Sequence, residues 1–142
     1  MHPEMSWFTT EVEYDGLPLL LRRPDNTGLR KLLMQFPFLT SIEHVFEQVQ
    51  NNGLPDPSHN ETLEEFDQYM CGLFEASGAG VIFLIETFAG RRIYYYCVAD
   101  PEVVYVSETE ILARYGFQIQ VDSDRTLAQG FIDHYPFDLG DQ

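Results

Sequence analysis

An amphipathic helix followed directly by an apolar β-hairpin is the feature that most constrains the fold of this chain. Across residues 62–76 apolar side chains recur with the helical period, which predicts a helix with one buried face. The Ser-Gly-Ala-Gly run at 77–80 ends this helix. Residues 81–88 then form an apolar strand, Ala89-Gly90 turns it, and residues 91–98 return as a second strand.

Further strands are predicted before this unit. Residues 7–14 alternate as a strand, Asp15-Gly16 is a hairpin turn signal, and residues 17–22 form the return strand. The apolar and aromatic stretch 32–46 is interpreted as a third strand, bent or placed at a sheet edge near Pro37, because proline cannot donate to a strand ladder.

A second helix and a last strand complete the predicted order. Ser107 and Glu110 have the spacing of a capping box, which predicts a short helix that ends at Gly116, and residues 117–121 alternate as a strand. From the third strand onward the order is βαββαβ, the ferredoxin-like arrangement. The sequence therefore predicts an α+β protein with a mostly antiparallel sheet, in which an N-terminal β-hairpin precedes the ferredoxin-like unit.

The length of 142 residues fits a single α+β domain over 1–142. Residues 5–46 hold its N-terminal strands, 60–123 the helix–hairpin–helix–strand unit, and 124–142 an acidic, aromatic tail. The chain shows no signal-peptide pattern and no apolar run of the roughly 20 residues that a membrane span needs. Cys71 and Cys97 lie in separate apolar segments, which indicates two reduced thiols in a cytoplasmic protein, with a disulfide between them as the open alternative.

The charge of the chain limits its partners. There are 23 acidic and only 8 basic residues, so the formal net charge is −15. Binding to nucleic-acid phosphates or to anionic lipids needs clustered Lys and Arg, and the charge argues against both. No Lys or Arg stands between Lys31 and Arg91, an interval that holds nine acids. We expect such an acidic surface to attract a basic protein partner.

The predicted contact surface combines the loop before the first helix with the acids of its first turns. The loop is rich in Asn, Pro and Gly, and the acids are favoured at the positive end of the helix dipole. A purely solvated helix face can carry the same acids, and this alternative stays open. The predicted surface residues are Asn52, Gly53, Pro55, Asp56, Glu61, Glu64, Glu65 and Asp67.

No motif predicts catalysis, a metal site or a cofactor. The histidines lack the spacing of a metalloprotease helix or a zinc site, and His44 is interpreted as a structural or surface residue. In the strand 91–98 we expect Tyr95 to pack inward, with Tyr94 and Tyr96 on the other face, beneath another layer or exposed. The alternative function is a small-molecule sensor or enzyme, with a pocket between the helices and the N-terminal strands.

Several motifs together resemble a bacterial family catalogued as domain of unknown function 695. The motifs are residues 7–14, Phe36-Pro37-Phe38-Leu39, Asn52-Gly53-Leu54-Pro55 ahead of the acidic helix, and the hairpin through Thr87, Gly90, Arg91, Arg92 and Tyr94 to Tyr96. The resemblance covers about residues 5–137 and implies no catalytic residue. Members of that family look like components of toxin–immunity gene neighbourhoods.

Residues 60–123 also look like the fold of the regulator of ribonuclease E activity B family, whose members are acidic proteins that inhibit a ribonuclease by binding it. Both resemblances imply an acidic inhibitor. Together with the charge layout, they predict a non-enzymatic cytoplasmic module that binds a basic protein such as a nuclease or toxin.

Overall fold

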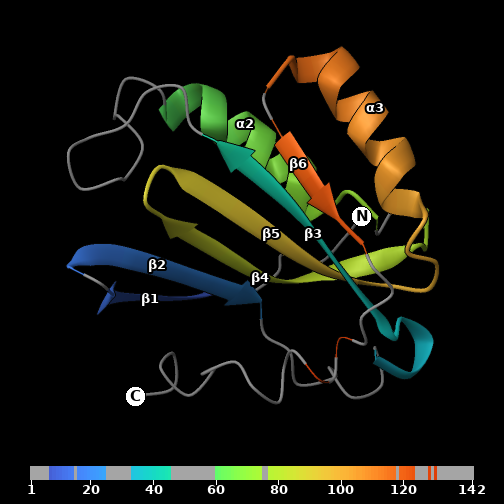
Figure 1. Cartoon of the computed structure of the whole chain (residues 1–142), viewed down its shortest axis with the longest axis horizontal. Helices are drawn as coiled ribbons and strands as arrows, with labels where there is room; N and C mark the ends of the chain where they lie inside the picture. Colours follow the sequence, from blue (N-terminus) through green and yellow to red (C-terminus); the bar gives the residue numbers. More distant parts are fainter. Residues whose placement is uncertain are drawn as a thin grey trace.

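A six-stranded sheet joins all the described strands, and two helices cover one of its faces (Figure 1). The computed structural model describes residues 7–14, 16–24, 33–45, 60–74, 77–117, 119–123, 128 and 130. The strands are β1 (Trp7–Tyr14), β2 (Leu17–Pro24), β3 (Phe38–Val45), β4 (Gly80–Phe88), β5 (Arg91–Val98) and β6 (Ile119–Asp122), and the helices are α2 (Asn60–Cys71) and α3 (Val103–Tyr115). The sheet order is β1-β2-β4-β5-β3-β6, and all neighbouring strands are antiparallel.

The strand order confirms the predicted α+β fold with its ferredoxin-like unit. Strand β5 lies between β3 and β4, so it is inserted into the β3–α2–β4 crossover, as the split-βαβ arrangement requires. Strand β6 pairs with the other edge of β3. The β1–β2 hairpin joins the remaining edge of β4, where Leu20 pairs with Thr87 and Arg22 with Ile85.

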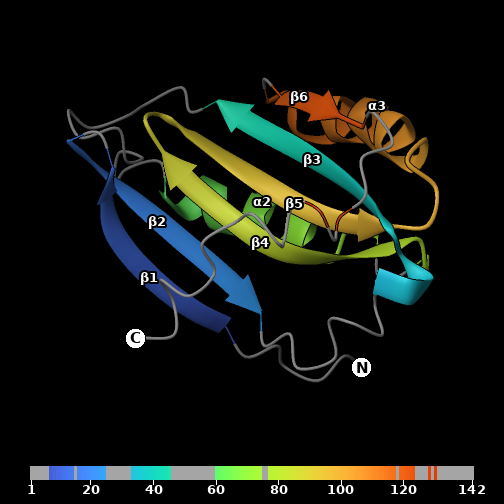
Figure 2. The same ribbon diagram turned by 60° about the horizontal axis from the view of Figure 1, so that its bottom comes forward.

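The main apolar core lies between the sheet and the two helices, which Figure 2 shows on the same face. Strand residues such as Tyr94 and Ile42 pack there against the inward sides of both helices. In and just after α2 the buried apolar side chains repeat at the helical period, as the sequence predicts. They are Leu63, Phe66, Met70 and Phe74.

A second, smaller cluster lies on the opposite face of the sheet and depends on a β-bulge in β4. The register of β4 against β5 shifts between Ile82 and Leu84, which makes Phe83 an extra residue in the strand. Ile82 and Ile85 therefore both face the helices, whereas Phe83 and Leu84 both belong to the second cluster. All four are buried, which explains the continuous apolar run from Val81 to Ile85 in β4.

The third strand is shorter than predicted. Residues 33–35 form a helical turn, and β3 begins at Phe38. Because Pro37 has no N–H to donate to the ladder, the strand starts after it and does not bend through it. Strand β3 is also paired on both sides, by β5 and β6, so the predicted edge position is wrong.

Helix α3 begins four residues before the predicted capping box. Ser107 lies one turn inside the helix, where its hydroxyl donates to the Val103 carbonyl at 3.1 Å. The true start follows Asp100-Pro101, and Asp100 Oδ1 accepts the N–H of Glu102 at 3.0 Å. Gly116 ends the helix as predicted, with a φ of 68° in the left-handed region.

The three tyrosines of β5 divide between the two faces. Tyr94 and Tyr96 are fully buried in the main core, the first of the two alternatives for this pair. Tyr95 lies on the opposite face, with its ring centroid 6.3 Å from that of Phe83. The residue predicted to pack inward, Tyr95, is therefore the most exposed of the three, because the helices cover the other side of the strand.

Candidate functional site

Exposed acids lie on the outward face of α2, as the sequence predicts. Glu64 and Glu65 are exposed, and neither forms an ion pair with a described residue. They precede Gln68, which is also exposed, by one helical turn. Five predicted surface side chains lie outside the described residues, namely those of Asn52, Gly53, Pro55, Asp56 and Glu61, of which Glu61 has its backbone in α2.

Asp67 corrects the predicted contact surface. Its side chain is only 12% exposed and lies against the sheet, so it is not part of an exposed acidic patch. Position 67 follows Leu63 by four residues and precedes Met70 by three, which places it on the buried side of α2. This spacing is a sequence signal that the prediction missed.

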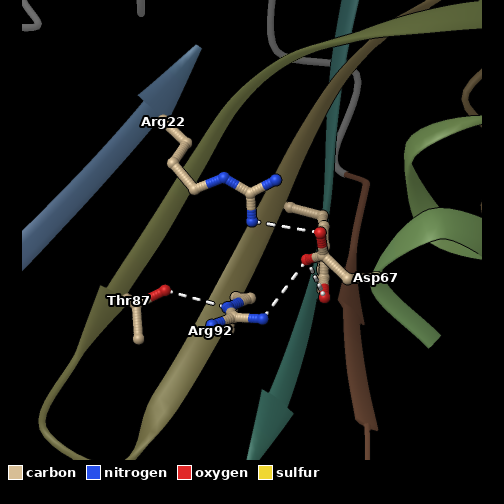
Figure 3. Close-up of polar contacts among 5 residues, drawn as sticks. Arg22, Asp67, Thr87 and Arg92 are labelled. Carbon is tan, nitrogen blue, oxygen red and sulfur yellow. Dashed lines mark hydrogen bonds and ion pairs between the residues drawn. The ribbon is translucent and has the colours of Figure 1, made fainter. Parts of the chain in front are cut away.

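Two arginines and a tyrosine surround the Asp67 carboxylate (Figure 3). Arg22 Nη1 lies 3.0 Å from Oδ2, and Arg92 Nη1 lies 3.2 Å from Oδ1. The Tyr94 hydroxyl donates to Oδ1 at 3.0 Å. Arg92 also donates through Nε to Thr87 Oγ1 at 2.9 Å, which orients its guanidinium plane. These five residues are named the Asp67 cluster below.

Strand register brings the partners of Asp67 together from distant parts of the chain. Arg22 pairs with Ile85 across β2 and β4, and Ile85 pairs with Tyr94 across β4 and β5. Two residues further along the same two strands, and on the same face, Thr87 pairs with Arg92. Because directly paired residues point to the same face of a sheet, these side chains all point toward α2. The cluster therefore ties the β1–β2 hairpin to the helix.

The buried tyrosines Tyr94 and Tyr96 donate hydrogen bonds that anchor α2. Burial raises the pKa of Tyr94 well above its ordinary value, the Asp67 carboxylate raises it further, and Arg92 lowers it. Tyr94 therefore keeps its proton and donates a hydrogen bond to the Asp67 carboxylate. Burial also raises the pKa of Tyr96 well above its ordinary value, and its hydroxyl donates to the Met70 carbonyl at 2.7 Å.

The other arginines with described side chains are also engaged within the molecule. Arg91 Nη1 lies 3.4 Å from Glu43 Oε1. The guanidinium carbon of Arg114 lies 4.8 Å from the ring centroid of Tyr69 and 5.5 Å from that of Tyr115, within cation–π range. Within the described part of the chain, no arginine forms an ion pair with Glu64 or Glu65.

Among the described histidines and cysteines, His44 and Cys97 are buried and Cys71 is half-buried. His44 is 1% exposed, and its ring centroid lies 4.8 Å from those of Phe66 and Phe117, which confirms a structural role. Cys71 and Cys97 are free thiols, and burial raises the pKa of Cys97 to about 12, so it is no thiolate at neutral pH. The described residues contain no group of His, Cys, Asp and Glu that could hold a metal ion.

The alternative function requires a pocket between the helices and the N-terminal strands. At this junction the Asp67 cluster bridges α2 and β2 directly. A hollow of about 370 Å³ lies on the β1–β2 hairpin, lined by Glu11, Glu13, Gly16, Leu17 and Pro18. Small-molecule pockets are usually lined by apolar and aromatic side chains, and this hollow has few of either.

The pairing partners of Asp67 left no local signal in the sequence. Arg22 and Arg92 are 45 and 25 residues away along the chain, and only the sheet order brings them to α2.

Among the described residues, no helix has both the length and the apolar character to cross a membrane. No protein-family model, curated protein or solved structure matches this chain.

Proposed function

We propose that this protein is a non-enzymatic acidic module that binds a basic protein, as an inhibitor or immunity-type protein of a nuclease or toxin. The contrast between the two sides of α2 carries the proposal. Asp67 is neutralised inside by two arginines, whereas Glu64 and Glu65 stand exposed without a described cation beside them. The described arginines serve internal contacts, so the surface charge is left for a partner.

A concentrated acidic surface acts on a basic partner in two ways. At physiological ionic strength the Debye length is about 8 Å, so each carboxylate acts mainly at short range. The summed field of a chain with a net charge of −15 still steers a cationic surface and raises its association rate. A nuclease or a toxin that binds nucleic acid suits this surface, because its cationic site accepts phosphates and can accept carboxylates in their place.

The same proposal accounts for the two family resemblances. The resemblance of residues 60–123 to the regulator of ribonuclease E activity B fold implies an acidic ferredoxin-like unit that inhibits a ribonuclease by contact. We also propose, on the same grounds, that the chain is related to the family catalogued as domain of unknown function 695. The free thiols of Cys71 and Cys97 support a reducing, cytoplasmic location.

Two charge-reversal variants with equal net charge test the contact surface. Glu64→Lys/Glu65→Lys changes exposed acids of α2, and Glu11→Lys/Glu13→Lys makes the same change on the exposed acids of β1. The probes are a small basic ribonuclease and a basic protein of similar size without nuclease activity, titrated at several NaCl concentrations. We expect the α2 variant to weaken binding of the ribonuclease by about tenfold or more, and the β1 variant to weaken it much less.

The other outcomes discriminate between versions of the proposal. Inhibition of RNA cleavage by the unchanged protein, but not by the α2 variant, identifies an inhibitor. Equal weakening by both variants would show that overall charge matters and that α2 is not the contact surface. The proposal fails if neither basic probe binds at low salt, or if the affinity does not fall as salt is added.

A further inference from the structure

Helix α3 exposes an uncharged stripe to solvent. Tyr105, Val106 and Leu112 are 45%, 64% and 46% exposed, which makes them large apolar side chains in contact with water. Thr109 and Ala113 lie on the same side and are exposed as well. With 3.6 residues per turn, these five positions fall within roughly one third of the helix circumference, opposite the buried residues of α3. They are named the α3 stripe below.

The α3 stripe stands out because the chain is so acidic. The outward face of a helix at a protein surface usually carries charged and polar side chains. In a chain with 23 acidic residues, the middle of this face carries none of them. A contiguous exposed apolar patch with a polar border is typical of an interaction site.

Acidic residues border the α3 stripe. Glu108 lies on one side of it, Glu110 on the other, and Glu102 at its N-terminal end. Burial raises the pKa of Tyr69 on α2, Glu110 raises it further and Arg114 lowers it, so both charges of α3 act on this residue of α2. Arg114 follows Glu110 by one helical turn and lies outside the stripe, with its guanidinium carbon 4.8 Å from the ring centroid of Tyr69.

We infer that the α3 stripe is the docking surface for the basic partner, and that this partner presents an apolar ridge flanked by Lys or Arg, as a basic amphipathic helix does. The inference rests on the proposed function, because that function makes the partner basic. The stripe offers apolar area to bury, while Glu108 and Glu110 complement flanking cations.

The α3 stripe and the exposed acids of α2 lie on neighbouring helices. Figures 1 and 2 show α2 and α3 on the same face of the sheet. The helices touch through Tyr69 and Tyr115, whose ring centroids are 5.4 Å apart. Glu65 precedes Tyr69 by one helical turn, so it lies on the same side of α2 as this contact.

A second copy of the chain does not suit the stripe. If two α3 helices packed antiparallel about a two-fold axis near Thr109, Glu108 and Glu110 of one copy would lie beside the same residues of the other. Like charges at such positions repel, and each chain carries a further excess of acid.

A pair of peptides tests the docking surface on the full chain. The probe is a Lys/Leu peptide of roughly 14 residues whose leucines form one helical stripe. A permuted peptide of the same composition carries the same charge without the stripe. Fluorescence anisotropy gives both affinities, and amide NMR shifts locate the contact. We expect the amphipathic peptide to bind at least about tenfold more tightly than the permuted one, with shifts concentrated in α3.

Matched variants separate apolar area from charge. Val106→Ser/Leu112→Gln removes apolar area from the stripe without changing the net charge. Met34→Gln removes a side chain that is 86% exposed from the turn before β3. Tyr105 is kept, because its hydroxyl donates to the Ser123 carbonyl at 3.4 Å. We expect the first variant to abolish the difference between the peptides and the second to preserve it, with thermal unfolding unchanged in both.

The possible failures point to different conclusions. Equal binding of the two peptides, with NMR shifts in α2 alone, would overturn the docking surface and leave the proposed function intact. Concentration-dependent dimerisation that the Val106→Ser/Leu112→Gln variant abolishes would assign the stripe to a second copy and overturn the inference. If neither the peptides nor the basic proteins bind at low salt, the proposed function itself fails.

Discussion

Helices α2 and α3 cover the same face of one sheet but divide their polar and apolar residues in opposite ways. Helix α2 buries a carboxylate, Asp67, and exposes glutamates. Helix α3 buries only uncharged residues and exposes Val106 and Leu112. The difference follows from what lies beneath each helix, because the strands under α2 supply Arg22 and Arg92 as partners for a buried charge.

The comparison separates a structural charge from a surface available for binding. A buried carboxylate is tolerated only with paired and hydrogen-bonded neighbours, so Asp67 serves the junction of hairpin and helix. Exposed apolar side chains such as Val106 have no such role in the folded chain, and under the docking proposal a partner would bury them. The predictions below test whether the inward and outward sides of the helices differ in this way.

Replacing Asp67 is expected to have the largest effect. Asp67→Ala removes the carboxylate that Arg22 and Arg92 both contact, and loss of one partner from a buried ion pair costs about 3–5 kcal/mol. Arg22 is 28% exposed, so water replaces part of the interaction. We expect the free energy of unfolding, measured by urea denaturation at neutral pH, to fall by about 3 kcal/mol.

The controls for this prediction lie on the same helix. Glu64→Ala changes an exposed acid and should alter the free energy of unfolding by less than about 0.5 kcal/mol. Asp67→Asn keeps an acceptor for Tyr94 but loses the charge, so its effect should be intermediate. Similar values for Asp67→Ala and Glu64→Ala would mean that the two sides of α2 do not differ.

Two adjacent residues of α3 give the next largest contrast. Ile111 is fully buried and Leu112 is 46% exposed. Ile111→Ala leaves a cavity and should lower the free energy of unfolding by about 2–3 kcal/mol, whereas Leu112→Ala should change it by less than about 0.5 kcal/mol. Denaturation of the two variants in parallel is the measurement. A large loss for Leu112→Ala would show that the stripe is already covered in the folded protein.

The smallest expected effect is alkaline sensitivity beneath α2. Burial raises the pKa values of Tyr94 and Tyr96, so the folded state keeps protons that the unfolded chain releases near its ordinary tyrosine pKa of 10.0. Their contribution is full below about pH 9 and declines as the pH rises further, because the unfolded chain then releases protons that the folded state keeps.

Tyr94→Phe tests this alkaline effect directly. The variant loses one hydrogen bond to Asp67, which should cost about 1 kcal/mol at neutral pH. It also removes one raised phenol, so its stability should decline less steeply above pH 10 than that of the unchanged protein. Urea denaturation at about pH 8 and pH 11 compares the two slopes. An identical slope in both proteins would be inconsistent with a proton held at Tyr94.

Local patterns predicted the elements whose alternation and turn residues agree. Strands β1 and β5 begin and end at the predicted residues, because Asp15-Gly16 and Ala89-Gly90 bound their alternating sequences. The start of α3 was misplaced because its first turn, Val103–Val106, is apolar on the outward side as well as the inward side. A helix with exposed apolar residues shows no clear amphipathic pattern, so hydrophobic periodicity does not locate its first residue.

Some features of the candidate site follow from local sequence patterns, and others depend on the sheet order. Exposure of Glu64 and Glu65, and burial of Asp67, both follow from the helical period. The pairing of Asp67 with Arg22 depends on the hairpin lying beside β4, and this is a consequence of the whole sheet order. No local pattern contains that information.

The sheet order also has a consequence for synthesis on the ribosome. The β1–β2 hairpin ends at Pro24, but the strand that it joins begins only at Gly80. At translation rates of roughly 5–20 residues per second, the hairpin is made several seconds before its neighbour. During that time its edges can pair with those of other nascent chains, and the charges of Glu11 and Glu13 oppose such pairing. Charges at these two exposed positions are therefore the feature of β1 that opposes edge-to-edge pairing before β4 is made.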